Sequence, residues 1–328
     1  MIASDTLTKV KSTRSQRLHK ALFRGDVLTV ANSEYRRTAQ EMMALLLRGD
    51  LAGRDLTVEA LALKHRSGTA VVSAKESGVA GGLDEAALLL QAHGVDVRME
   101  RKDGDSFHAG DVLLHLSGDV GTLLSLERVV LNVLQRMSGV ATAARNLADC
   151  VFRCSSVTRV VGTRKTPWGL LDKRALHLGH CGTHRLGLSD AILIKNNHLA
   201  LLASREEDAV RPAIERAWAL RHESAFIEVE VRGEAAARKA AQTFQRLQED
   251  YSEEYPCLLL LDNMSPQSTA LALDMLRRER LWESILVEAS GGINDENLDA
   301  YATCGVDAIS IGAITHSTRA LDLSQTIS

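Results

Sequence analysis

The sequence predicts an α/β protein, with an α/β barrel in the second half and an α+β sandwich domain before it. In the second half, short apolar runs alternate with stretches of helical periodicity, as in successive βα units. This alternation alone fits either a barrel or a doubly wound open sheet. Polar residues or glycines also lie at or next to the C-terminal ends of the runs, where barrel enzymes hold their active sites. They are Arg164, Lys195, Glu230, Asp262, Ser290 and Gly312.

The strands expected in the barrel are short and mostly apolar, as parallel strands buried on both faces are. They cover residues 157–164, 189–195, 226–231, 257–262, 285–289 and 306–311. Helices are expected between them at 212–221, 234–249, 266–280 and 294–303. Ser265 and Pro266 fit an N-cap followed by a first-turn proline, and Pro212 is expected to open its helix in the same way.

The first half has a different pattern. Strands are expected at 70–79 and 96–99 around a helix at 83–93, and a further strand at 112–116. Apolar residues spaced four, three and four apart predict a long helix at 127–150 that bridges the two domains. We therefore divide the chain into an N-terminal extension (1–36), a sandwich domain (37–140) on which 318–328 pack back, and the barrel (141–317).

Composition limits the class of protein. The 328 residues carry a formal net charge of -3, with 45% hydrophobic and 25% charged residues. This balance is ordinary for a globular protein and argues against a nucleic-acid binder. No apolar run reaches the length of a membrane span, and the basic N-terminus lacks the apolar core of a secretory signal. Five scattered cysteines form no zinc pattern and fit a cytoplasmic protein.

Cations are concentrated between residues 162 and 198. This stretch holds six Lys or Arg and four His but only two acids. Arginine matches a planar carboxylate with two donors, whereas lysine adds a point charge. The stretch therefore predicts a pocket for a polyanionic small molecule. Its candidate ligands are Arg164, Lys165, His184, Arg185 and Lys195, with Arg128 supplied by the first half.

Acids and glycines complete the predicted site. Glu230 and Asp262 end neighbouring strands in apolar surroundings, so we expect them to bind Mg²⁺ together with substrate oxygens, or else to form an ion pair with Lys165 or Lys195. Ser290, Gly291 and Gly292 precede a helix and offer backbone N–H groups to a phosphate, and the turn at Gly312 repeats this one strand later. Together these groups suggest a sugar phosphate with a pyrophosphate leaving group, and an acidic co-substrate.

At this point the sequence resembles a known family, the quinolinate phosphoribosyltransferases. The resemblance runs from about residue 45 to residue 317. It is carried by LLLRGDLAGRDLT, SGVAGGLDEA, DGDSFHAGD, LERVVLNVLQRMSGVAT, TRKT, THRLGLSDAILIKNNH, EVEV, LLLLDNMSP, EASGGI and GVDAISIGAITHS.

The resemblance implies a fold, a reaction and a set of roles. The fold is a sandwich domain with an open barrel of about seven strands, in a homodimer whose Arg128 reaches the neighbouring site. The reaction uses phosphoribosyl pyrophosphate, quinolinate and magnesium to give nicotinate mononucleotide, pyrophosphate and CO2. The implied quinolinate ligands are Arg128, Arg164, His184, Arg185 and Lys195. Lys165, Glu230 and Asp262 match groups around the ribose, pyrophosphate and magnesium, and Lys165, Lys195, Glu230 and Asp262 are the expected catalytic residues.

Three departures from the family pattern affect the pocket. A usual glycine triplet reads Gly179-His180-Cys181-Gly182-Thr183, an aspartate is replaced by Asn196, and TPWGLL stands in a segment about two residues shorter. The first of these would permit the closest alternative, a phosphoribosyltransferase of the same fold with another aromatic acceptor. A Schiff-base aldolase using Lys195 and a non-catalytic ligand-binding homologue are further alternatives.

Overall fold

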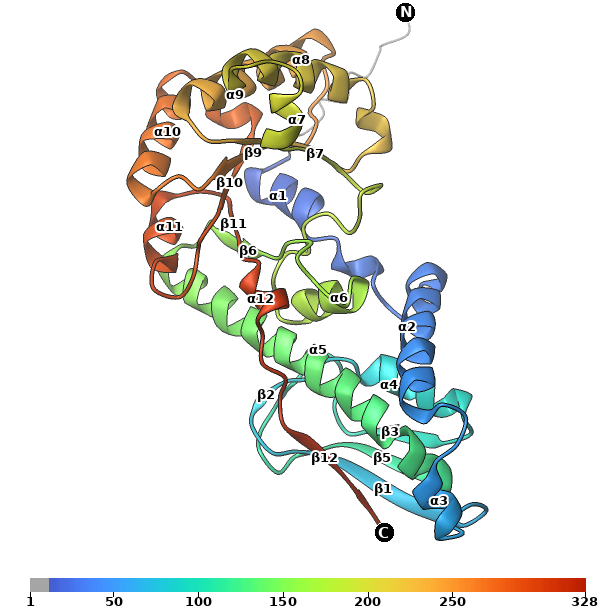
Figure 1. Ribbon diagram of the computed structural model, residues 1–328. Helices are drawn as coiled ribbons and strands as arrows, with labels where there is room; N and C mark the ends of the chain where they lie inside the picture. Colours follow the sequence, from blue (N-terminus) through green and yellow to red (C-terminus); the bar gives the residue numbers. More distant parts are fainter. Residues whose placement is uncertain (1–11) are drawn as a thin grey trace, which may run out of the picture.

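The computed structural model describes residues 12–328 and has two parts (Figure 1). An α/β barrel forms one part and an α+β sandwich the other. The long helix α5 (Val120–Cys154) runs from the sandwich along the side of the barrel. It is longer than the helix expected at 127–150, because it begins seven residues earlier, at Val120. The Asp119 carboxylate caps this start by accepting a hydrogen bond from the backbone N–H of Thr122. Among residues 12–328, no helix combines the length and apolar character needed to cross a membrane.

The sandwich is built on an antiparallel sheet with strand order β12-β1-β5-β3. Its strands are β1 (Ser67–Ala74), β3 (Asp96–Met99), β5 (Val112–Asp119) and β12 (Leu323–Ile327). The C-terminal strand β12 returns from the barrel to pair with β1, with Ala70 opposite Ile327. The helices of this part are α2 (Ser33–Leu51), α3 (Leu56–Ala60) and α4 (Leu83–Ala92).

The strand expected at 70–79 is two strands. After β1, the chain turns and forms β2 (Gly78–Val79), which pairs with β4 (Ser106–Phe107) in a separate two-stranded sheet. The backbone N–H of Val79 also donates to the hydroxyl of Thr142 on α5. Tertiary pairing with β4 and α5 therefore holds the second half of the expected strand apart from the main sheet, which local pattern could not predict.

The barrel is an open parallel sheet with strand order β6-β11-β10-β9-β8-β7. Each of the six expected runs overlaps a strand: β6 (Arg159–Val161), β7 (Ile192–Ile194), β8 (Ile227–Val231), β9 (Cys257–Asp262), β10 (Leu286–Ser290) and β11 (Ala308–Ser310). A parallel bridge from Val161 to Gly182 adds a short seventh segment beside β6.

Helices surround this sheet (Figure 1). They are α6 (Leu170–Leu178), α7 (Asn196–Ala200), α8 (Glu206–Trp218), α9 (Glu234–Asp250), α10 (Pro266–Arg278), α11 (Leu298–Cys304) and α12 (Ala313–His316). The start of α10 is as predicted, with Ser265 capping Ser268. The prediction for Pro212 is wrong: it lies inside α8, which starts six residues earlier with an acidic first turn that suits the helix dipole.

The barrel interior changes from apolar to polar along its axis, because side chains two apart on a strand face the same way. A buried cluster inside the barrel is apolar. It comprises Ala191, Phe226, Leu258, Leu286 and Ala308, which lie near the N-terminal ends of their strands, and Val161 at the end of β6. Two residues further along β8 and β10, the inward positions are Glu228 and Glu288, both buried. The next inward positions reach the open end of the barrel.

Helix α1 (Arg14–Leu22) fills the N-terminal end of the barrel. Leu18, Ala21 and Leu22 join the apolar cluster described above. Arg14 makes two 2.5 Å contacts to the carboxylate of Asp307, and its guanidinium stacks 3.6 Å from the Trp282 ring. Residues of the N-terminal extension thus complete the barrel core.

Candidate active site

A cavity of about 410 Å³ opens at the C-terminal ends of the barrel strands. It brings together side chains from β7, β8, β9, β10 and β11, from Lys195 after β7, and from the 163–165 and 184–185 loops. Its lining residues are Thr163, Arg164, Lys165, His184, Arg185, Leu193, Lys195, Glu230, Leu260, Asp262, Glu288, Ser290 and Ser310. Most of the residues selected from the sequence therefore lie around one cavity.

The two acids lie on one wall of this cavity. Asn196 Nδ2 donates to Glu230 Oε1 at 2.7 Å and lies 3.5 Å from Asp262 Oδ2, so a single amide nitrogen contacts both carboxylates. Arg232 Nε donates to Asp262 Oδ2 at 3.2 Å. The alternative of an ion pair with Lys165 or Lys195 is not what the structure has, because the nitrogen partners of these acids are Asn196 and Arg232.

Several cations also line the cavity. The Arg185 side chain is buried and donates to the carbonyl of Ala191 at 3.1 Å, which fixes the guanidinium. Burial, and then the neighbouring Arg164, lower the pKa of Arg185. Behind these arginines, buried Lys173 donates to the carbonyl of Thr183. A wall with several cations and partial desolvation is a strong environment for a bound carboxylate.

His184 faces the floor of the cavity. Its Nε2 lies 3.0 Å from Glu228 Oε2 and 3.4 Å from Glu288 Oε2. The backbone N–H of Arg185 donates to Nδ1 at 2.7 Å, which favours a neutral ring. Burial also opposes charge, but Glu288 and Glu228 outweigh both effects and raise the pKa of His184 to about 9. Both ring nitrogens thus have protein partners. The sequence predicted His184 as a quinolinate ligand and did not predict these contacts.

Two glycine turns follow β10 and β11, next to the cavity residues Ser290 and Ser310. Gly291 has φ +98° and Gly292 has φ +61°, the left-handed region that glycine adopts without strain. A Cβ on Gly291 would lie 2.3 Å from Asn263 Oδ1. At Gly312, a Cβ would lie 3.1 Å from Lys165 Cδ. A side chain is therefore excluded at Gly291, and the lack of one at Gly312 lets Lys165 pack against that turn. The three glycines adjoin the cavity in sequence but do not line it.

Arg128 is the one selected side chain that lies away from the cavity. It projects from α5 with 56% of its side chain exposed, and its charged neighbour is Glu127 at 3.8 Å. The described chain therefore does not bring Arg128 to its own cavity.

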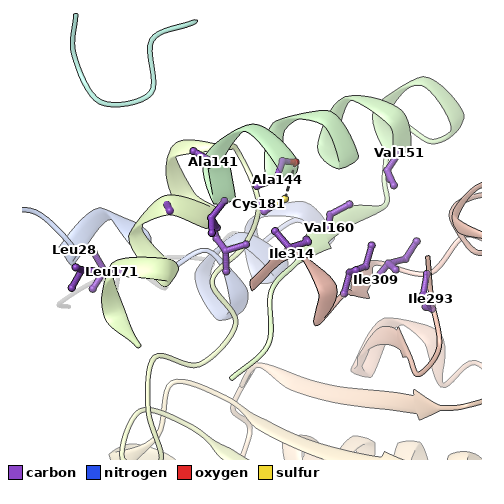
Figure 2. Packing of buried hydrophobic residues seen from close by; sticks show 14 of the residues in the cluster. Leu28, Ala141, Ala144, Val151, Val160, Leu171, Cys181, Ile293, Ile309 and Ile314 are labelled. Carbon is purple, nitrogen blue, oxygen red and sulfur yellow. Dashed lines mark hydrogen bonds between the residues drawn. The ribbon is translucent and has the colours of Figure 1, made fainter. Parts of the chain in front are cut away.

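The unusual His180-Cys181 pair also lies away from the cavity. His180 Nε2 is 3.0 Å from the Arg145 guanidinium, and buried Cys181 donates to the carbonyl of Ala144 at 3.2 Å. Figure 2 shows Cys181 beside Ala141 and Ala144 of α5. The change expected to alter the pocket instead packs against the long helix, although His180 needs a positive φ of 67° there.

Sequence reasoning missed four charged residues of the site: Lys173, Glu228, Arg232 and Glu288. Two of them carried a usable signal, because Glu228 and Glu288 stand two residues before Glu230 and Ser290 on their strands. Residues two apart on a strand share a face, so both acids had to point inward. Lys173 lies on a helix, where no local pattern distinguishes it from a surface lysine.

An open α/β barrel with this cation wall, acid pair and phosphate-type turns defines an enzyme that acts on polyanionic substrates. Comparison with known proteins specifies the family. Residues 55–138 match the N-terminal domain model of quinolinate phosphoribosyl transferase, and residues 140–326 match its C-terminal domain model. The chain belongs to the quinolinate phosphoribosyl transferase family.

Individual relatives agree. The chain is 36% identical over 292 residues to the nicotinate-nucleotide pyrophosphorylase [carboxylating] of Mycobacterium leprae, covering 87% of this chain and 95% of the relative. It is 34% identical over 281 residues to the probable enzyme of that name from Methanothermobacter thermautotrophicus, covering 85% and 95%. The solved structure of NadC from Streptococcus pyogenes aligns with a TM-score of 0.76 at 29% identity, over 89% of this chain and 97% of that one.

Proposed function

We propose that this protein transfers the phosphoribosyl group of phosphoribosyl pyrophosphate to quinolinate and releases pyrophosphate and CO2, forming nicotinate mononucleotide for NAD synthesis. The observation that carries the proposal is that Arg164, Arg185 and Lys195 line the same cavity as Glu230 and Asp262, in a member of this family. The five cysteines are all free thiols, which supports action in a reducing compartment such as the cytoplasm.

Quinolinate carries two adjacent carboxylates, and the cation wall supports their binding. Arg185 is held by its hydrogen bond to the carbonyl of Ala191, so little side-chain entropy is lost when its guanidinium donates to a carboxylate. Arg164 and Lys195 line the same cavity and offer further donors. We assign acceptor binding to these three side chains, with His184 supporting the floor through its buried acids.

The acid pair and the glycine turns would receive phosphoribosyl pyrophosphate. The oxygens of Glu230 and Asp262 converge on one amide nitrogen, Asn196 Nδ2. This oxygen-rich donor set fits magnesium, with Glu230 and Asp262 as its protein ligands. Bound magnesium would offset the charge of pyrophosphate. The turns at Ser290–Gly292 and Gly312 would hold the 5-phosphate beside Lys165.

The reaction follows from position and charge. As the bond from the ribose carbon to pyrophosphate breaks, the ribose becomes cation-like, and the carboxylate of Glu230 or Asp262 stabilises it. The pyridine nitrogen supplies the electron pair of the new bond. The ring is then cationic, so the bond to the adjacent carboxylate can break, leaving its electron pair on the ring carbon, which takes up a proton. Positioning by the cation wall supplies most of the rate enhancement.

The direct test uses purified protein with quinolinate, phosphoribosyl pyrophosphate and magnesium. We expect nicotinate mononucleotide and CO2 in equal amounts, and no product when nicotinate replaces quinolinate. Product from nicotinate, or none from quinolinate in folded protein, would favour the alternative of another aromatic acceptor. No observation favours the aldolase alternative: Lys195 is exposed, not in the desolvated setting that such a lysine needs.

We further propose a homodimer in which Arg128 enters the neighbouring site. Its exposed position outside its own cavity supports this assignment. Arg128→Ala and Arg164→Ala should each be inactive alone. Mixed and reassembled, half of the dimers are hybrids with one intact site, so about a quarter of wild-type activity should return by simple statistics. No recovery would indicate that Arg128 acts within its own chain, and full activity of Arg128→Ala alone would indicate that Arg128 has no role in the site.

A further inference from the structure

We infer that Asn196 is a positioning residue that occupies the space between Glu230 and Asp262 in the free protein and so keeps this acid pair from binding a divalent cation tightly. The inference deepens the proposed function, on which the assignment of the acid pair rests. It concerns the state of the site before any substrate binds.

The contacts of Asn196 carry the first step. Its Nδ2 lies 2.7 Å from Glu230 Oε1 and 3.5 Å from Asp262 Oδ2, and its backbone N–H lies 3.4 Å from the same Glu230 oxygen. Carboxylates accept and do not donate hydrogen bonds, so the amide must turn its nitrogen toward them. One amide N–H group serves each acid. Two carboxylates that would otherwise repel each other are held together by a neutral donor.

Arg232 carries the second step. It follows β8 directly, and its Nε donates to Asp262 Oδ2 at 3.2 Å, the same oxygen that Asn196 approaches. In the free protein, the converging oxygens of the acid pair are therefore already bound by N–H groups. A cation that binds there must displace the amide nitrogen of Asn196.

Charge carries the third step. Asn196 Oδ1 is buried and has no hydrogen-bond partner among the described residues. An aspartate at this position would keep the shape but present a third carboxylate and no donor. Three converging carboxylates repel one another unless a cation lies between them, and affinity for hard cations rises with the number of charged ligands. With asparagine at position 196, the two carboxylates of the free site are hydrogen-bonded to one amide. With aspartate there, they would favour a bound cation.

The test measures Mn²⁺ binding to the full-length protein without substrates, by electron paramagnetic resonance of free Mn²⁺. Asn196→Asp should bind Mn²⁺ about tenfold or more tightly than wild type. Asn196→Ala, which removes the clamp without adding charge, should fall between the two. Asn197→Asp is the matched control, because its exposed neighbouring position adds the same charge without facing the acid pair. It should bind Mn²⁺ as weakly as wild type.

Thermal denaturation provides a second readout. Mn²⁺ should raise the melting temperature of Asn196→Asp more than that of wild type, since a ligand stabilises only the state that binds it. Equal Mn²⁺ affinity for wild type, Asn196→Asp and Asn196→Ala would overturn the inference, as would equal gains in both aspartate variants. These measurements use no quinolinate or phosphoribosyl pyrophosphate, so failure of the proposed reaction would appear separately in the turnover assay.

Discussion

Gly291 provides the sharpest structural prediction for the phosphate-binding turn. Its φ of +98° lies beyond the left-handed region that L side chains tolerate, and a Cβ would lie 2.3 Å from Asn263 Oδ1 and 2.8 Å from the Asn263 backbone nitrogen. Gly292 is the natural control. Its φ is +61°, and nothing lies within 4 Å of an added Cβ. An alanine at Gly291 would therefore meet both a less favourable backbone φ and a steric overlap, whereas an alanine at Gly292 would meet no overlap.

The expected magnitudes follow from these two terms. For Gly291→Ala, an unfavourable φ costs about 1–3 kcal/mol, and the steric overlap adds about 1–3 kcal/mol. Part of the overlap is with backbone, which cannot move freely because the Asn263 N–H donates to the carbonyl of Ser290 at 2.8 Å. For Gly292→Ala only the left-handed conformation remains, at about 1–2 kcal/mol. Gly291→Ala should therefore be the more destabilising change.

Two measurements check this difference. Thermal denaturation of both variants should show a clearly larger loss for Gly291→Ala. In the turnover assay, the KM for phosphoribosyl pyrophosphate should rise for Gly291→Ala, while the KM for quinolinate changes little, because the turn lies on the phosphate side. Equal melting temperatures for the two variants would refute the steric argument. A rise confined to the KM for quinolinate would refute the assignment of the turn.

Three further predictions concern other parts of the molecule. Arg185→Ala should raise the KM for quinolinate about 10- to 100-fold, the loss of a charge-assisted hydrogen bond, without a similar rise for phosphoribosyl pyrophosphate. Burial lowers the pKa of Lys173 to about 7 in the folded protein, so above that pH the unfolded chain binds the extra proton. The stability of wild type relative to Lys173→Met should rise between pH 7 and pH 9, measured by urea denaturation; a constant difference would contradict this. Arg14→Ala breaks the part-buried pair with Asp307 and should cost about 2–4 kcal/mol and speed proteolysis near α1, unlike exposed Lys20→Ala.

The sequence predicted most of the cavity because the chemistry lies at strand ends. Arg164, Lys195, Glu230, Asp262 and Ser290 each follow an apolar run, and the carboxyl ends of parallel strands meet at one edge. Once the runs are recognised as strands, their last residues must converge, whatever the details of packing. Periodicity therefore predicted the strands, and the convergence of strand ends predicted part of the cavity lining, although it missed Glu288.

Features that depend on distant contacts could not be predicted in this way. Helix α1 is short and basic, and its place in the barrel depends on Asp307, 293 residues away from Arg14. The His180-Cys181 change was expected to alter the pocket because it puts side chains where the resembled family usually has a glycine triplet. The backbone turns at His180, so Cys181 instead meets α5 at the carbonyl of Ala144. Sequence proximity to a site residue therefore does not place a side chain in the site.

The interior of the barrel connects these observations. Inward positions change from apolar at α1, through Glu228 and Glu288, to Glu230 and Ser290 at the cavity. The apolar layer stabilises the barrel, and the buried acids bind His184, whose neighbour Arg185 faces the ligand. Buried acids are costly unless paired, so this middle layer would weaken a barrel that had no cations above it. The acids therefore have a physical reason to accompany an anion site: they balance the cations that must remain charged before the substrate binds.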